Sequence, residues 1–230
     1  MKRFNVSVHL TKVSVSLRDL GLRHTLKRIT EDILFRKLFL FRNYFIVEKQ
    51  LDGAGQVELR NPQLDFKFIH ADDSEILKQI QLLSGLTRGL VLKLLNNGGE
   101  CVVAIDNGNM VGFNLVSTGQ VYLRYLCGHV SLSNKQAWSE QTAIKPSYRR
   151  TGVSSDLRHI MFDHLARKGY SQVIGGYVPA NKNAALVDKK LGYVVREKVT
   201  LYKVLWWRKY LVKRLSPTLT EPLPIASVKF

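Results

Sequence analysis

Residues 137 to 168 carry the pattern that most restricts how this chain can fold: a strand-like run, a turn and an amphipathic run. The run AWSEQTAI is predicted to be a strand. The residues predicted on one face of that strand are Trp138, Glu140, Thr142 and Ile144. Pro146 then ends the strand, and apolar residues recur at helical spacing from 152 to 168. A strand that leads through a tight turn into a helix is typical of α/β proteins.

The elements predicted around this unit support the same fold class. Two apolar runs, 101–105 and 110–116, flank the turn-forming sequence DNGN and predict a hairpin. The remaining predicted elements are strands at 66–69, 121–132, 171–178 and 199–207 and helices at 71–83 and 180–192. No internal repeat interrupts this order, so we predict an α/β domain.

The composition favours a folded protein with an anionic partner. The chain has 230 residues, and 35 Lys and Arg against 18 Asp and Glu give a formal net charge of +17. An acyl-CoA, an acidic acyl carrier protein and an anionic membrane surface fit this charge. Nucleic acid is disfavoured because the basic residues are spread along the chain and no reading motif occurs. Cys101 and Cys127 match no disulfide framework and no CxxC motif, so we predict free thiols, a cytoplasmic location and no metal.

The turn IKPSYRRTGVSS places the start of a helix directly after a strand. The first amide groups of a helix have no partner within it and lie at the positive end of its dipole, so they favour an anion. Gly152 allows a ligand to approach the backbone closely, and Arg149 and Arg150 add positive charge. Taken alone, the same residues also fit an ordinary basic connection between a strand and a helix.

Two motifs in this region resemble those of the GNAT superfamily of N-acyltransferases. Motif A of that family reads Gln or Arg, two residues, Gly, one residue, and Gly or Ala; Arg149, Gly152 and Ser154 occupy these positions here, with Ser154 as a departure. Downstream, NKNAALVDKKLGY is similar to motif B, an Asn and an Ala followed by a helix that ends in Lys, an apolar residue, Gly and an aromatic residue. The two motifs occur in the family's order, and the resemblance spans residues 64 to 205.

This resemblance implies a GNAT-type mixed, twisted sheet, flanked by helices, that splays between two central parallel strands. Acetyl-CoA or another acyl-CoA is expected in the gap as co-substrate, with its pyrophosphate on the main-chain amides of the turn. The residues assigned to it are Ala143, Ile144, Arg149, Arg150, Thr151, Gly152, Val153, Ser154, Asn181 and Asn183. The implied reaction is direct transfer of the acyl group to a primary amine.

Direct transfer needs a base for the amine and an acid for the departing thiolate. Glu140 is the candidate base, although a surface or ion-paired carboxylate would look the same in sequence. Many family members have a tyrosine acid on the motif B helix, where this chain has Asp188, a poor acid at its ordinary pKa. Tyr193 and Tyr177 are alternative acids or packing residues. The candidate catalytic residues are therefore Glu140, Asp188 and Tyr193.

Two further groups of residues are interpreted as structural. His159 and Asp163 lie four residues apart on a predicted helix, as a solvated surface pair would. Cys127 and His129 lie near the end of a predicted strand, where a structural role is favoured over nucleophilic catalysis.

Both ends of the chain are basic and aromatic. We predict a basic amphipathic accessory region at 1–60 with a helical extension, the acyltransferase domain at 64–205, and a basic aromatic tail at 206–230. The run LYKVLWWRKYLVKRL suits an anionic membrane surface as well as a packed element with solvated cations. A long-chain N-acyltransferase that uses acyl carrier protein, and an acyl-CoA-binding module without turnover, are the alternatives to an N-acetyltransferase.

Overall fold

The computed structural model describes residues 39–51, 53, 58–215 and 225–226. The predicted N-terminal helical extension lies outside these residues. By internal contacts the chain divides into two compact units. The larger unit comprises Tyr44–Lys198 with Lys213–Phe230, and the smaller comprises Met1–Asn43 with Val199–Val212.

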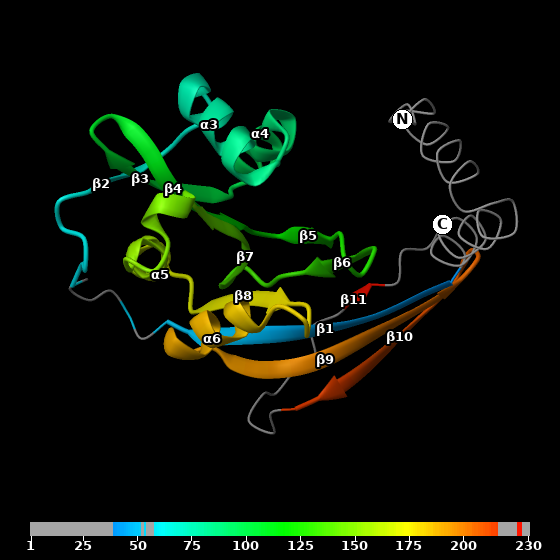
Figure 1. Cartoon of the computed structure of the whole chain (residues 1–230). Helices are drawn as coiled ribbons and strands as arrows, with labels where there is room; N and C mark the ends of the chain where they lie inside the picture. The colour runs from blue at the N-terminus through cyan, green and yellow to red at the C-terminus, as the bar shows by residue number, and fades with distance from the viewer. Residues whose placement is uncertain (1–38, 52, 54–57, 216–224, 227–230) are drawn as a thin grey trace, which may run out of the picture. The chain divides into compact units, whose positions relative to one another are not determined.

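The larger unit is built on a mixed sheet (Figure 1). Its strands in spatial order are β9 (Val194–Val204) and β1 (Phe39–Gln50), each only as far as it belongs to this unit, then β8 (Gln172–Tyr177), β7 (Gln136–Ile144), β4 (Asn109–Ser117), β3 (Glu100–Asp106) and β2 (Asp65–Phe68). β7 and β8 run parallel, whereas β1 with β8, β4 with β7, β3 with β4 and β2 with β3 run antiparallel. The predicted mixed sheet with two central parallel strands is therefore confirmed.

The predicted hairpin is confirmed as β3 and β4. Its turn residues Asn107 and Gly108 have φ values of 48° and 76°. Two consecutive positive φ values are the conformation that a tight two-residue hairpin requires, and Asn followed by Gly adopts it readily.

Helices cover both faces of this sheet. On one face, α3 (Ser74–Ser84) and α4 (Arg88–Asn96) pack with Val103, Phe113 and other residues of β3 and β4 in one buried cluster. On the other face, α5 (Val153–Arg167) packs with Val102 and Ala104 in a second cluster. Alternate residues of β3 thus belong to the two cores, as the pleat of a strand demands. The helix α4 was not predicted from the sequence.

A second, smaller sheet follows β4 in the chain. Its strands are β5 (Gln120–Leu123), β6 (Gly128–Ser131) and β11 (Ile225–Ala226), in the order β11-β6-β5, all antiparallel. The hairpin of β5 and β6 connects β4 to β7, so it leaves the main sheet next to the strand pair on which the candidate site lies.

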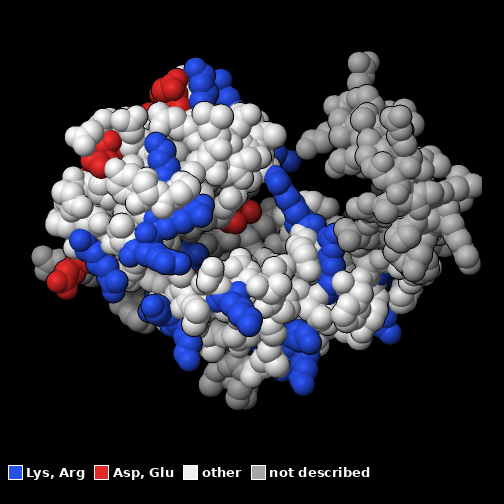
Figure 2. Space-filling view, viewed as in Figure 1, with Lys and Arg blue, Asp and Glu red and all other residues white. Residues whose placement is uncertain are grey.

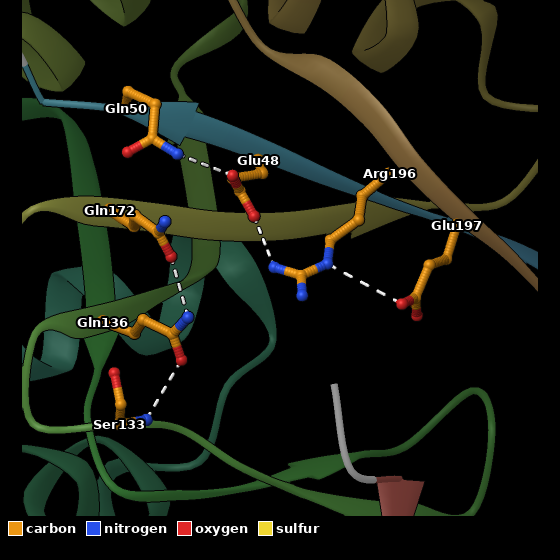
Figure 3. A network of polar contacts seen from close by, with 7 residues as sticks. All are labelled: Glu48, Gln50, Ser133, Gln136, Gln172, Arg196 and Glu197. Atoms are coloured by element: carbon orange, nitrogen blue, oxygen red, sulfur yellow. Dashed lines mark hydrogen bonds and ion pairs between the residues drawn. The ribbon is translucent and has the colours of Figure 1, made fainter. Parts of the chain in front are cut away.

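The strand β1 lies between β8 and β9, inside the main sheet (Figure 1). It falls within residues 1–60, for which we predicted an accessory region. A buried ion pair joins it to β9: the Arg196 guanidinium donates to Glu48, which also accepts a 2.7 Å hydrogen bond from Gln50 (Figure 3). Glu197 lies beside Arg196, with 3.7 Å between the charged atoms. Residues 44–50 are therefore an integral strand of the larger unit.

The smaller unit, where it is described, consists of strand segments. Phe41 of β1 packs edge-on against Tyr202 of β9 with ring centroids 5.1 Å apart, and Thr200 donates a 2.9 Å hydrogen bond to Asn43. β10 (Trp207–Arg214) follows β9 after a two-residue turn, so the predicted strand at 199–207 is two strands.

Candidate active site

The two central parallel strands separate along their length. β7 and β8 are paired at three positions only, Gln136 with Gln172, Ala137 with Val173 and Trp138 with Ile174. A 2.7 Å hydrogen bond between the side chains of Gln136 and Gln172 joins their beginnings (Figure 3). Beyond Trp138, β7 keeps its pairing with β4 as far as Ile144. Its other backbone edge, which faces β8, is not paired with β8 along this stretch, so its backbone groups can accept another partner.

A β-bulge lies at Glu140 on this free stretch of β7. Leu115 pairs with Gln141 and Val116 with Ser139, which leaves Glu140 as the extra residue. A bulge directs two successive side chains to one side of the sheet and redirects those that follow.

This bulge corrects the predicted face of β7. Trp138, Glu140 and Gln141 line one cavity, whereas Thr142 bonds to a side chain of α5 and Ile144 packs in the α5 core. The prediction that Trp138, Glu140, Thr142 and Ile144 share one face is wrong for the last two, because strict alternation fails at the bulge.

Glu140 lies in a part-buried, polar environment. Its Oε1 accepts a 2.7 Å hydrogen bond from the Ser117 hydroxyl, and Arg124 lies near enough to act on it electrostatically. Burial raises the pKa of Glu140, although the Ser117 hydrogen bond and Arg124 both oppose the rise. A carboxylate with a raised pKa accepts protons more readily at neutral pH.

A cavity of about 580 Å³ opens beside Glu140. On the face seen in Figure 2, an acidic side chain lies inside a hollow, and Lys and Arg side chains lie on the surface around it. The residues that line the cavity come from α4, the β5–β6 hairpin, β7 and, at Tyr44, β1. Its volume falls within the usual range for small-molecule sites, about 300–1,000 Å³.

Tyr44 of β1 is a site residue that the sequence analysis missed. It lines the cavity together with Glu140, and its ring packs on Gly176 of β8, where an added Cβ would lie 2.3 Å from the tyrosine Cε1. Burial, helped by the nearby carboxylates of Glu140 and Asp188, raises the pKa of Tyr44, so its hydroxyl stays protonated. In the sequence, Tyr44 is one of several aromatic residues in the segment that was assigned to the accessory region at 1–60.

Asp188 belongs to a chain of polar contacts that crosses the sheet. Arg158 of α5 donates to Asp188 of α6 (Lys182–Lys190) at 2.6 Å and to the Thr142 hydroxyl at 3.2 Å. The Asn114 amide donates to the same hydroxyl at 2.8 Å. Asp188 is buried, and its contact with the Arg158 guanidinium is a charge-assisted hydrogen bond.

The two candidate tyrosines of the motif B region have different surroundings. Tyr193 is buried in the main core beside Phe162, with ring centroids 6.0 Å apart. Tyr177 is half-buried on β8 and packs against Phe45 at 5.6 Å. Burial raises the pKa of both hydroxyl groups. Among the described residues that line the cavity, neither appears.

The predicted phosphate turn has the backbone that an anion site needs. Gly152 is the N-cap of α5 with a φ of 100°, a conformation that favours glycine. The amides of Ser155 and Asp156 already bond to the Gly152 carbonyl. Those of Val153 and Ser154 precede the first bonds inside the helix, so they are the donors available to an anion.

A buried carboxylate, also missed in the sequence, fixes this turn. Asp156 is fully buried and accepts from the Arg60 amide at 3.1 Å, the Asn61 amide at 3.0 Å and the Asn61 side chain at 2.7 Å. Asn61 also donates to the Thr151 carbonyl at 3.2 Å. The Arg60 side chain consequently lies over Gly152, where an added Cβ would come within 2.8 Å of its Cδ.

The other residues assigned to the acyl-CoA are distributed around this turn and α6. Arg149 and Arg150 are exposed on the turn, and Arg150 has a positive φ of 69°. Asn181 caps α6, where its side chain accepts a 3.1 Å hydrogen bond from Ala184, and Asn183 is exposed in the first turn of that helix.

The pairs interpreted as structural have packing partners. Asp163 pairs with Arg167 at 2.8 Å, and His159 lies edge-on to Phe162. His129 packs against Tyr122 with ring centroids 4.9 Å apart. Among the described residues, no group of His, Cys, Asp and Glu could hold a metal ion, and no helix is long and apolar enough to cross a membrane.

Comparison with known proteins connects this geometry to a fold family. Neither protein-family models nor curated proteins match the sequence. A GCN5-related N-acetyltransferase from Sphaerobacter thermophilus is similar in structure, with a TM-score of 0.53, 15% identity, and coverage of 86% of this chain and 59% of that chain. A GNAT-family acetyltransferase from Novosphingobium aromaticivorans has a TM-score of 0.51, 12% identity, and coverage of 77% and 66%.

A Drosophila protein of solved structure is similar as well, with a TM-score of 0.50, 14% identity, and coverage of 81% of this chain and 58% of that one. The chain thus spans about three fifths of the length of these structures. At such identities the likeness concerns the fold, and it agrees with the sheet that divides between β7 and β8. The chain has the fold of the GNAT N-acetyltransferases.

Proposed function

We propose that the protein is an N-acyltransferase that moves an acyl group from an acyl-CoA, in the first place acetyl-CoA, to a primary amine. The observation that carries the proposal is the position of Glu140. It projects from a bulge on the free stretch of β7 into a cavity, on the strand that leads to the anion-binding turn at Gly152. One strand thus carries both a base and a route to a phosphate site.

The acyl-CoA would lie along the free backbone edge of β7. Its pantetheine arm can bond to the backbone near Ala143 and Ile144, because β8 does not pair there. Its pyrophosphate can accept from the amides of Val153 and Ser154, with Arg149 and Arg150 as surrounding charges. Asn181 would act indirectly, through its cap on α6.

The amine would enter from the cavity beside Glu140. Glu140 takes a proton from the ammonium group, directly or through water, and the neutral nitrogen attacks the thioester carbonyl carbon. A new C–N bond forms, the C–S bond breaks, and the electron pair leaves with the CoA sulfur. The pKa of Glu140, raised by burial, supports this role.

The departing thiolate needs a proton, and we assign this step to Tyr44. The Asp188 side chain is engaged by Arg158 at 2.6 Å, Tyr193 lies in the core, and neither is among the described residues that line the cavity beside Glu140, so neither suits the role. Tyr44 shares the cavity with Glu140. The negative charge of Glu140 is one of those that raise the pKa of Tyr44. When Glu140 takes the amine proton, that charge is neutralised, so Tyr44 donates its proton more easily. The attacking nitrogen loses its second proton, which passes through water to restore the Tyr44 hydroxyl, and Glu140 releases the first proton to solvent.

Calorimetry with acetyl-CoA, followed by thiol release over a panel of amines, tests the proposal. We expect acetyl-CoA to bind and the thiol to appear only when an amine is present. The Glu140→Gln variant is expected to bind acetyl-CoA normally and to lose turnover. Absence of binding by any acyl-CoA defeats the proposal, whereas binding without thiol release favours a binding module without turnover.

The β9–β10 turn supports a second candidate, action at a membrane surface on long acyl chains carried by CoA or by acyl carrier protein. Trp206 is 82% exposed and Trp207 is 52% exposed, next to Arg208 and Lys209. Exposed indole rings beside cations suit the headgroup region of an anionic bilayer. Co-sedimentation with anionic vesicles at low salt should be lost in Trp206→Ala; equal sedimentation of the two proteins, or none by either, refutes this candidate.

A further inference from the structure

We propose that the acceptor is an amine that also carries a carboxylate, on a body with a large apolar or aromatic group, as in an aromatic amino acid. This rests on the proposed function, because it assigns the occupant of the cavity beside Glu140. The amine would lie at Glu140 and the carboxylate at Arg124 and Lys93, at the mouth of the same cavity.

The charges that line the cavity are of both signs and come from different elements. Among the described residues that line it, Glu140 is the acidic one, on β7, whereas Lys93 belongs to α4 and Arg124 to the turn between β5 and β6. Arg124 and Lys93 are exposed, while Glu140 is partly buried. The negative charge is thus deep and the positive charges lie toward solvent.

This arrangement selects against two classes of amine. A polycation would bring further positive charges next to Arg124 and Lys93, with one carboxylate to offset them. A simple monoamine would satisfy Glu140 but leave the two cations without a partner from the substrate. A molecule with an ammonium and a carboxylate group matches both ends, and a guanidinium binds a carboxylate in two parallel hydrogen bonds.

The walls of the cavity indicate which side group the acceptor amine carries. These walls are aromatic and apolar. The aromatic residues are Tyr44, Tyr122, Tyr125 and Trp138, and the apolar ones include Leu86, before α4, and Leu90 of α4. Tyr44 and Tyr125 lie 5.7 Å apart between ring centroids. Aromatic side chains bind flat apolar groups well, in offset or edge-on contact. A short hydrophilic amino acid would leave these walls uncovered.

Three acceptors that differ only at the carboxylate test this inference: tyrosine, tyrosinamide and tyramine, each assayed for thiol release with saturating acetyl-CoA. We expect kcat/KM for tyrosine to exceed that for tyramine by about tenfold or more. In Arg124→Glu the order should reverse, with tyramine preferred. Arg88→Ala removes an exposed cation of α4 that does not line the cavity, and it should keep the preference of the wild type.

The ratio between the two substrates, measured in each variant, is the decisive quantity. Removal of Arg124 also raises the pKa of Glu140, which changes the rate for every amine, but this effect cancels in the ratio. Equal use of tyrosine and tyramine by the wild type, or an unchanged ratio in Arg124→Glu, overturns the inference while the proposed function stands. No thiol release with any amine overturns the proposed function itself.

Discussion

Replacement of Asp156 by Ala should destabilise the protein strongly, although Asp156 looks in sequence like an ordinary acid in the first turn of a helix. The carboxylate is fully buried and accepts three hydrogen bonds from Arg60 and Asn61. The change removes every acceptor and leaves the Asn61 amide and side chain buried without their partner.

The magnitude follows from the two bonds to Asn61. Hydrogen bonds to a charged group contribute roughly 1.5–3 kcal/mol each, and the exposed Arg60 can turn its amide to water. Two bonds that share one acceptor are not additive, so we expect the free energy of unfolding to fall by about 4 kcal/mol. For a chain of this size, that loss lowers the melting temperature by about 10 °C. Asp156→Asn, which keeps one acceptor oxygen, should lose about half as much.

Urea unfolding followed by circular dichroism measures this loss, and calorimetry with acetyl-CoA measures its effect on the turn that Asn61 holds through Thr151. Glu75→Ala is the matched control, because Glu75 is also an acid in a first turn but is exposed and paired with Lys78 at 3.2 Å. Its loss should cost less than about 1 kcal/mol. If Asp156→Ala is as mild as Glu75→Ala, the account of Asp156 as the anchor of the turn is incorrect.

The remaining predictions concern the reaction and its binding sites. Glu140→Gln should lower kcat by about 10²–10⁴-fold. Because burial raises the pKa of Glu140, activity should fall as pH drops through a value above that of an ordinary glutamate, and Ser117→Ala should shift this limb to higher pH in a pH–rate profile. Tyr44→Phe should slow thiol release by roughly 10²-fold without weakening acetyl-CoA binding; an unchanged rate excludes Tyr44 as the acid. Gly152→Ala should cost roughly 1–2 kcal/mol in urea unfolding, since φ is 100° there, and should weaken acetyl-CoA binding beside Arg60; unaltered affinity would count against the turn as a phosphate site.

Local sequence signals were enough for the elements that carry the motifs. The helix after Gly152 and the hairpin around Asn107 and Gly108 were predictable because their turn residues and their apolar spacing lie within a few residues of each other. The strand β1 was not, because its place depends on pairing with β8, far along the chain. The aromatic residues at 39–45 favour a strand mainly through packing against neighbouring strands, which the local sequence does not reveal.

The candidate site was predictable in part, and for the same reason. Glu140 stood out on a strand next to a recognisable turn, but the bulge that aims it depends on the pairing of β7 with β4. Tyr44 and Arg124 come from segments that meet Glu140 only through the tertiary fold. No spacing in the sequence relates them, since nothing in a linear pattern encodes the side of a cavity on which a residue lies.

The central place of β1 also has a consequence for how the chain reaches its fold. This strand is made long before its neighbours β8 and β9, which follow much later in the chain. Pairings between such distant segments form slowly, and a strand that waits for its partners exposes an edge on which other chains can pair. The sequence FLFRNYFIVEK carries the charges of Arg42, Glu48 and Lys49 in a largely aromatic and apolar run, where charges oppose aggregation until β8 emerges.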